Sequence, residues 1–97
     1  MYGSRPGIYY ANLADMTGEQ KYVYKAITFH ESVPGHHFQL ALAQELGGLP
    51  KFRKFGGGNA FVEGWALYAE KLAKEMGFYT EPMHDFGRLQ DEIWRSV

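Results

Sequence analysis

Residues 29–46 read FHESVPGHHFQLALAQEL, and a Pro-Gly pair divides this stretch into two parts. Before the pair, the apolar residues at positions 23, 26 and 27 and His30 recur with helical spacing, which predicts an amphipathic helix with His30 on its apolar face. Proline removes a backbone donor and clashes with the preceding turn, so this helix must end or bulge at Pro34-Gly35. A second helix is predicted from His36 to Leu46, because Gly47-Gly48 is a typical helix C-cap.

The rest of the chain predicts a mainly α fold with four helical segments. Residues 7–13, GIYYANL, are rich in β-formers and predict one short strand or extended piece. Thr17 and Gln20 have capping-box spacing, so the first helix should begin near Gly18. The stretch 51–59, KFRKFGGGN, is typical of a connecting loop. Two more helices should follow, from Ala60 to Met76 with Asn59 as N-cap, and from Pro82 to the end.

Composition excludes several classes of function. The chain has 97 residues, 45% of them hydrophobic, which is enough for one small folded domain. Ten basic and eleven acidic residues give a net charge of -1 without a basic tract, so nucleic-acid binding is not expected. Cysteine is absent, which excludes disulfides and thiolate ligands. No apolar run reaches the ~18 residues of a membrane span, and MYGSRPG (1–7) has no signal-peptide character. The cellular compartment stays open.

The C-terminal stretch GRLQDEIWRSV (87–97) predicts a helix without a stop signal. Leu89, Ile93 and Trp94 share one stripe of it. We therefore expect residues 1–97 to be a single segment of a larger helical domain. The aromatic residues are expected in its core: Phe38, Phe61, Trp65, Tyr68 and Trp94.

The histidines of the Pro-Gly stretch are candidate metal ligands. Without cysteine, zinc needs imidazole and carboxylate ligands. His37 lies on the same helical face as His30, but ~10.5 Å further along a regular helix, which is too far for one ion. If Pro34-Gly35 loops out, His36 can take the position one turn after His30. Glu31, beside the first histidine, would then be the general base, as in zinc-protease helices, or else a surface carboxylate.

A third ligand is expected from the helix that follows the glycine loop. Glu63 is the one charged residue between Ala60 and Ala69, in a segment that is apolar all round. Such a helix should be buried, and a metal would compensate a buried carboxylate. The alternative is a carboxylate placed at the helix start by the macrodipole. Glu70, two turns on, could accept a hydrogen bond from a ligand histidine or pair with Lys74.

Four stretches of the chain resemble a bacterial family known as domain of unknown function 885. They are RPGIYYANL (5–13), HESVPGHHFQLALAQEL (30–46), FRKFGGGNAFVEGWALYAEKLAKEMG (52–77) and FGRLQDEIWRSV (86–97). The resemblance implies a largely helical protein of several hundred residues, of which this chain holds a partial zincin-like catalytic core. It implies a zinc-dependent peptidase of the gluzincin type, which in several members looks like an exported lipoprotein.

The family pattern His-Glu-x-x-Pro-Gly-His, followed by Glu-Gly-Trp, implies His30, His36 and Glu63 as zinc ligands and Glu31 as the catalytic base. His37 matches the pattern less consistently. The chain departs from the family at GGGN (56–59), where an aromatic residue often precedes the Glu-Gly-Trp segment. The substrate-binding walls of a full-length member would lie outside the chain.

Two functions are therefore expected as alternatives. The first is a zinc-dependent hydrolase that cleaves peptide bonds, with a peptide as partner. The second is a helical segment with a structural or vestigial metal site, or none, and no activity of its own. In that case it would associate with itself or with the remainder of its parent through exposed apolar faces.

Overall fold

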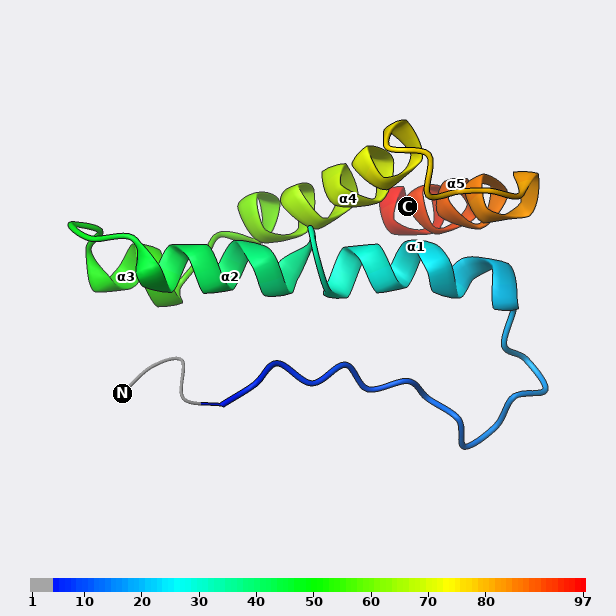
Figure 1. Ribbon diagram of the computed structural model, residues 1–97, viewed down its shortest axis with the longest axis horizontal. Coiled ribbons are helices and arrows are strands. Elements are labelled where there is room, and N and C mark those ends of the chain that lie inside the picture. The colour runs from blue at the N-terminus through cyan, green and yellow to red at the C-terminus, as the bar shows by residue number, and fades with distance from the viewer. Residues whose placement is uncertain (1–4) are drawn as a thin grey trace.

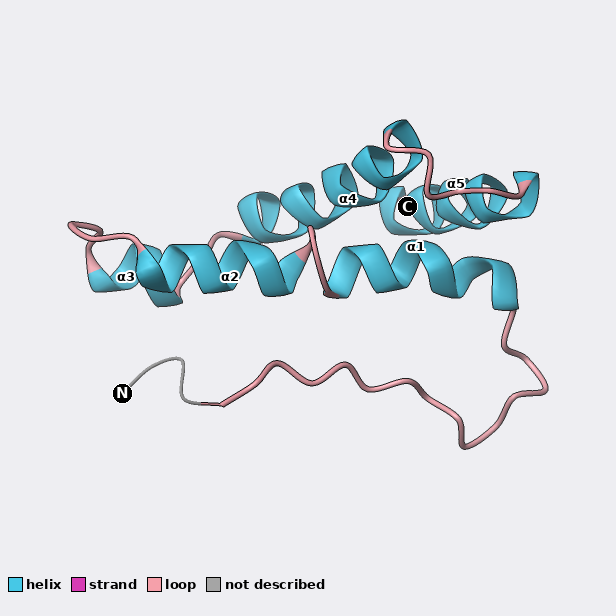
Figure 2. Ribbon diagram, viewed as in Figure 1, coloured by secondary structure: helices cyan, strands magenta, loops and turns pink. Residues whose placement is uncertain are grey.

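A computed structural model describes residues 5–97 and shows a helical protein. Its helices are α1 (Lys21–Glu31), α2 (His36–Glu45), α3 (Lys51–Phe55), α4 (Asn59–Glu75) and α5 (Pro82–Ser96). No strand occurs within this described range. Residues 7–13, predicted as a short strand or an extended piece, form an extended piece (Figure 2). The mainly α fold is confirmed. Residues 1–4, the first part of MYGSRPG, lie outside the described residues.

The helices are arranged around the break between α1 and α2, which lies in the middle of the histidine stretch (Figure 1). α1 and α2 run end to end, and four residues, 32–35, separate them. α4 and α5 lie on one side of this line: α5 packs beside α1, and α4 crosses to contact both α1 and α2. The extended segment runs along the opposite side. The break between α1 and α2 therefore lies at the centre of the molecule, where α4 covers it.

Two helix starts differ from their predictions. α1 begins at Lys21, and the Thr17–Gln20 capping box does not form, because Thr17 donates from both its backbone N–H and its hydroxyl to Asp15 Oδ1. Asn59 is the first residue of α4 and makes no capping hydrogen bond; Gly58 is the N-cap.

The segment predicted as a loop contains a fifth helix. Pro50 leads into the five residues of α3, and the three glycines that follow end it. Five residues form little more than one turn, which is too short for a periodic apolar pattern.

Among residues 5–97 alanines, not aromatic residues, are the fully buried apolar side chains, so the prediction of an aromatic core is wrong. The fully buried apolar residues are Ala26 on α1 and Ala66, Ala69 and Ala73 on α4. Ala66, Ala69 and Ala73 are three or four positions apart, so they form one narrow stripe of methyl groups along α4. Four of the five aromatic residues expected in the core are exposed: Phe38, Phe61, Tyr68 and Trp94. They project from the outer faces of helices whose inner faces are already filled.

Aromatic pairs hold α1 against the C-terminal half of the chain. Tyr22 meets Phe86 of α5 edge to face, with 5.7 Å between ring centroids. Phe29 packs on Phe78 and Tyr79 in the connection between α4 and α5, at 5.2 and 6.2 Å. Such pairs contribute about 0.5–1.5 kcal/mol each beyond their area burial. The last turn of α1, which carries His30, is thereby fixed relative to α4 and α5.

Among the helices of residues 5–97, none combines the length and the apolar character that crossing a membrane requires.

Candidate metal centre

The chain between α1 and α2 loops out at Pro34-Gly35 and returns directly above the last turn of α1. The Val33–Pro34 peptide bond is cis. A Cβ on Gly35 would lie 1.9 Å from the carbonyl oxygen of His30, so only glycine fits this return. From α4, the Trp65 Nε1–H donates to the Pro34 carbonyl at 2.8 Å, and the Gly35 carbonyl accepts from the Gln39 N–H. The break is therefore held from both sides.

This return places the His36 ring beside the His30 ring. The ring centroids are 4.6 Å apart and the planes are nearly perpendicular, at 89°. Both Nε2 atoms face one oxygen of Glu63 on α4: Oε2 lies 3.3 Å from His30 Nε2 and 3.6 Å from His36 Nε2. The three ligand atoms lie within 4.8 Å of one another. The structure thus brings together the three residues predicted as ligands, from three different helices.

The distances and the lone pairs suit a cation at this position. Ligand atoms ~2.1 Å from one zinc ion in tetrahedral geometry lie ~3.4 Å apart, close to both observed Nε2–Oε2 distances. When His30 donates its Nδ1–H to Glu70, its Nε2 carries a lone pair aimed at the Glu63 carboxylate. Two lone pairs at 3.3 Å repel each other unless a proton or a metal ion lies between them. Two imidazoles and one carboxylate are a ligand set that zinc accepts.

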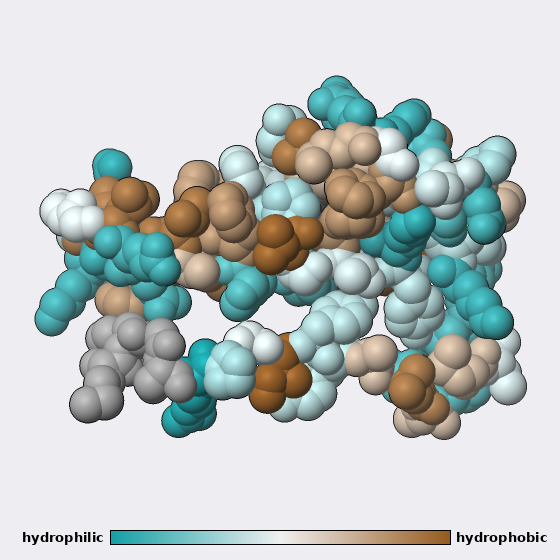
Figure 3. All heavy atoms as spheres, viewed as in Figure 1, coloured by the Kyte–Doolittle hydropathy of each residue, from teal (hydrophilic) through white to brown (hydrophobic). Residues whose placement is uncertain are grey.

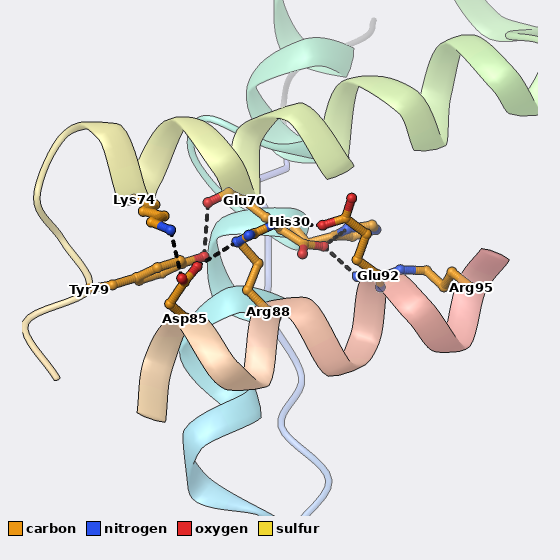
Figure 4. A network of polar contacts seen from close by, with 8 residues as sticks. All are labelled: His30, Glu70, Lys74, Tyr79, Asp85, Arg88, Glu92 and Arg95. Atoms are coloured by element: carbon orange, nitrogen blue, oxygen red, sulfur yellow. Dashed lines mark hydrogen bonds and ion pairs between the residues drawn. The ribbon is translucent and has the colours of Figure 1, made fainter. Parts of the chain in front are cut away.

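Glu70 fixes the orientation of His30 from the opposite edge of its ring (Figure 4). The His30 Nδ1 lies 2.7 Å from Glu70 Oε1, and the Glu70 side chain is only 1% exposed. The same oxygen accepts a hydrogen bond from Arg95 Nη2 of α5 at 2.6 Å. A buried carboxylate is costly unless it is paired and hydrogen-bonded, and here it has both partners. This contact directs the His30 Nε2 toward Glu63.

The alternative partner proposed for Glu70 is wrong. Lys74 instead reaches across to Asp85 of α5, with 2.6 Å between Nζ and Oδ2. Arg88 also binds Asp85 and pairs with Glu92 one turn along α5 (Figure 4). Spacing within α4 favoured the Lys74 pair, but α5 supplies a closer partner for each of the two α4 residues.

These contacts shift the pKa of three groups near the site. The hydrogen bond to Glu70 raises the pKa of His30, although burial opposes the shift. Burial raises the pKa of Tyr79 to about 12, and the nearby Glu70 charge adds to this shift. The hydroxyl of Tyr79 donates to the Glu70 backbone carbonyl at 3.0 Å. Burial also raises the pKa of the Asp91 carboxyl, on the helix face toward Glu70 and His30. In metal-free protein, His30 therefore holds its proton to higher pH than an exposed histidine.

The predicted burial of Glu63 is wrong, although its position in the cluster agrees with the ligand hypothesis. Its side chain is 54% exposed, because only the stripe of α4 that carries the alanines faces α1. His36 and His30 are far more enclosed, with side chains 15% and 6% exposed. Within residues 5–97, the buried His36 Nδ1 has no hydrogen-bond partner, so the polar contact of the ring is made at its Nε2 edge.

Glu31 and His37 lie outside the ligand cluster. Glu31 is the last residue of α1; it is exposed and lines a groove together with His36. His37 is also exposed and lines the same groove, where its ring packs against Gly7 of the extended segment. His36 is the second histidine that faces Glu63.

Sequence reasoning missed the role of Arg95. It lies 25 positions beyond Glu70 on a different helix, so no local spacing connects the two residues. One available signal was weak: on α4, Glu70 lies on the apolar stripe with Ala66 and Ala73, where a carboxylate requires a cationic partner from another element.

Comparison with known proteins gives one match. A family model described as "Bacterial protein of unknown function (DUF885)" matches residues 1–97. Neither a curated protein nor a solved structure matches the chain. The match extends over the whole sequence, including the histidine stretch, the Glu63 segment and α5. The chain therefore belongs to the bacterial DUF885 family.

Proposed function

We propose that the chain carries the metal-binding part of a zinc-dependent hydrolase that cleaves peptide bonds. The observation that carries the proposal is the convergence of His30, His36 and Glu63, whose ligand atoms lie within 4.8 Å of one another. The three residues would hold one zinc ion, with a fourth position open for water or substrate. A bound zinc ion would lower the pKa of a water ligand and polarise the carbonyl to be attacked.

The residues of the chain have separate tasks in this proposal. Glu31 is exposed and shares a groove with His36, so its carboxylate can take a proton from the attacking water. The same proton then passes to the amine that leaves when the peptide bond breaks. Glu70 and Arg95 do not contact the substrate; they keep the His30 Nε2 directed at the ligand cluster. The paired, buried Glu70 makes this orientation independent of solvent.

Paired substitutions at the two candidate carboxylates test the proposal. Glu63→Gln replaces a charged ligand by a neutral amide, so bound zinc should be lost or held far more weakly. Glu31→Gln keeps the shape and removes the proton acceptor, so zinc should stay while peptide turnover falls ~10²–10⁴-fold. Glu45→Gln, at an exposed carboxylate at the end of α2, is the control and should change neither quantity. Zinc is measured by elemental analysis and turnover with a fluorogenic peptide.

Three results would contradict this assignment. No zinc on the folded chain, even after zinc is supplied, removes the proposed function. Loss of zinc in Glu31→Gln makes Glu31 a ligand and leaves the reaction without its base. If Glu63→Gln retains both zinc and turnover, Glu63 is not a ligand but a carboxylate that the macrodipole favours at the helix start.

The exposed apolar surface favours a second candidate, a helical segment that associates through this surface. Large side chains are exposed around α2, α3 and the start of α4, and hydrophobic residues gather there in Figure 3. They surround a groove of ≈580 Å³; among the residues that line it are Phe38, Leu42, Leu46, Phe52 and Phe61. Association without zinc binding, measured by sedimentation on the same samples, would support this candidate over the hydrolase.

A further inference from the structure

Residues 7–12 of the extended segment form one wall of a groove beside the candidate metal centre. The groove has a volume of ≈720 Å³, within the range of ~300–1,000 Å³ typical of ligand sites. Its opposite wall is formed by α1 and the start of α2, and it includes Glu31 and His36. In Figures 1 and 3 the segment forms the lower rim of the molecule. The groove therefore opens onto the two residues that the proposed reaction needs near its substrate.

The segment is fixed at both ends of the groove. At one end Gly7 lies so close to the His37 ring that a Cβ would be 2.6 Å from Cε1 and Nδ1. At the other end the Asn12 carbonyl accepts a hydrogen bond from the Tyr24 hydroxyl of α1 at 3.3 Å. These two contacts hold the segment beside the helices without filling the space between them.

Between the two anchors, the backbone of residues 8–11 is unpaired. Within the described range 5–97, their N–H and C=O groups make no hydrogen bond. An extended backbone with free N–H and C=O groups is a template on which a second strand can pair. The four residues span ~13 Å, enough to align a comparable length of a bound chain.

The charges of the groove narrow the choice of ligand. Two carboxylates, Glu19 and Glu31, line it, and within residues 5–97 its lining contains no Lys or Arg. Apolar and aromatic groups make up most of the rest, among them Tyr9, Tyr24 and Leu40. A ligand with acidic side chains would be repelled, whereas neutral, apolar or basic side chains are accommodated.

We propose that this groove binds an extended peptide without acidic side chains, whose backbone pairs with residues 8–11 as an added strand. The inference rests on the proposed function, and it names the kind of substrate and the way in which the substrate is held. The bound strand runs past Glu31 and His36, so pairing sets which peptide bond lies at the ligand cluster.

Because backbone N–H groups alternate in direction along a strand, substitutions at two adjacent residues can test the proposed pairing. Successive N–H groups of an extended chain point in opposite directions, so of two adjacent residues only one donates to a partner in the groove. Tyr9→Pro and Tyr10→Pro each remove one N–H, and Tyr9→Ala and Tyr10→Ala remove the same side chains while keeping the N–H. Relative to its alanine control, one proline variant should bind peptide about 3- to 10-fold more weakly, as expected for one hydrogen bond, and the other should be unchanged.

Binding is measured by fluorescence anisotropy on zinc-loaded chain that carries Glu31→Gln, so that the probe is not cut. The probes are a labelled neutral octapeptide, the same peptide with alternate backbone nitrogens methylated, and an acidic octapeptide. The neutral peptide should bind best, and both of the others should bind at least several-fold more weakly.

Each contrary outcome has a clear meaning. Absence of binding by the neutral peptide, equal binding of the methylated peptide, or proline variants that both match their alanine controls would overturn the inference. Equal or better binding of the acidic peptide would overturn it too. Zinc stoichiometry is measured on the same samples. Normal zinc with no peptide binding overturns the groove inference alone, whereas chains that take up no zinc overturn the proposed function.

Discussion

Two ion pairs between α4 and α5 have the same length and should differ several-fold in their contribution to stability. Arg95 meets Glu70 at 2.6 Å, and Lys74 meets Asp85 at 2.6 Å. The Glu70 side chain is 1% exposed, whereas those of Asp85 and Lys74 are 25% and 50% exposed. Both pairs join the same two helices, and each carboxylate keeps a second partner, His30 for Glu70 and Arg88 for Asp85, so the main difference between them is the burial of the carboxylate.

The structure sets the expected magnitudes. Breaking a buried ion pair costs about 3–5 kcal/mol, because an unpaired charge stays behind. For Arg95→Gln we expect about 2–3 kcal/mol, since the Arg95 side chain is 31% exposed and His30 still donates to Glu70. For Lys74→Gln we expect less than about 1 kcal/mol, as for exposed pairs. With m-values of about 1–3 kcal/mol/M, Arg95→Gln should lower the urea midpoint by about 0.7–3 M.

The assay is urea unfolding followed by far-UV circular dichroism, with both variants compared with the unmodified chain. A further variant, Arg95→Gln combined with Glu70→Gln, removes the stranded charge and should recover part of the loss. Equal midpoint shifts in Arg95→Gln and Lys74→Gln would refute the reasoning, because Glu70 would then be no more dependent on its partner than an exposed carboxylate. Failure of the double variant to recover any stability would point to lost packing instead.

Two further predictions concern the candidate metal centre. In metal-free protein His30 should titrate above its ordinary pKa of 6.5 in a histidine NMR titration, and Glu70→Gln should lower the pKa of His30. Because the folded pKa is raised, the contribution of His30 to stability is fully present below about pH 6.5 and is lost as the pH rises through the folded pKa. An unchanged His30 titration in Glu70→Gln would contradict the assignment. Gly35→Ala should destabilise the chain and weaken zinc binding, since its Cβ would lie 1.9 Å from the His30 carbonyl oxygen. The control Gly64→Ala, whose Cβ would have no atom within 4 Å, should raise the free energy of unfolding by about 0.5–1 kcal/mol and leave zinc binding unchanged. Similar effects in the two variants would exclude a special role for the Pro34-Gly35 loop.

The sequence predicted the helices wherever strong stop signals flank a periodic run. Pro34-Gly35, Gly47-Gly48 and Gly77 each act through the local backbone, so they could be read without knowledge of the tertiary structure. The start of α1 could not be read in this way, because Thr17 has two local partners to choose from. It bonds Asp15 in a turn instead of capping a helix.

The candidate site was predictable only in part. The spacing of His30 and His36 required a looped break, which a Pro-Gly pair can provide, and this placed the two rings together. The exposure of the Glu63 side chain could not be predicted, because the sequence of an apolar helix does not reveal which of its faces packs against another helix. The partners of Glu70 depend on how α5 crosses α4, and that crossing is set by packing between distant parts of the chain.

The buried alanines, Ala26 of α1 and the stripe on α4, limit how substitutions can change the spacing of the candidate ligands. Alanine is the smallest residue with a Cβ, so almost every substitution at Ala26, Ala66 or Ala69 adds atoms to a closed contact. The added atoms can be accommodated only if the helices move apart, and His30 lies one turn from Ala26. Larger residues at this contact would therefore lengthen, not shorten, the 3.3 Å between His30 Nε2 and Glu63 Oε2. Under the metal-site proposal, substitutions at this contact would therefore weaken the binding of a small ion more readily than they would strengthen it.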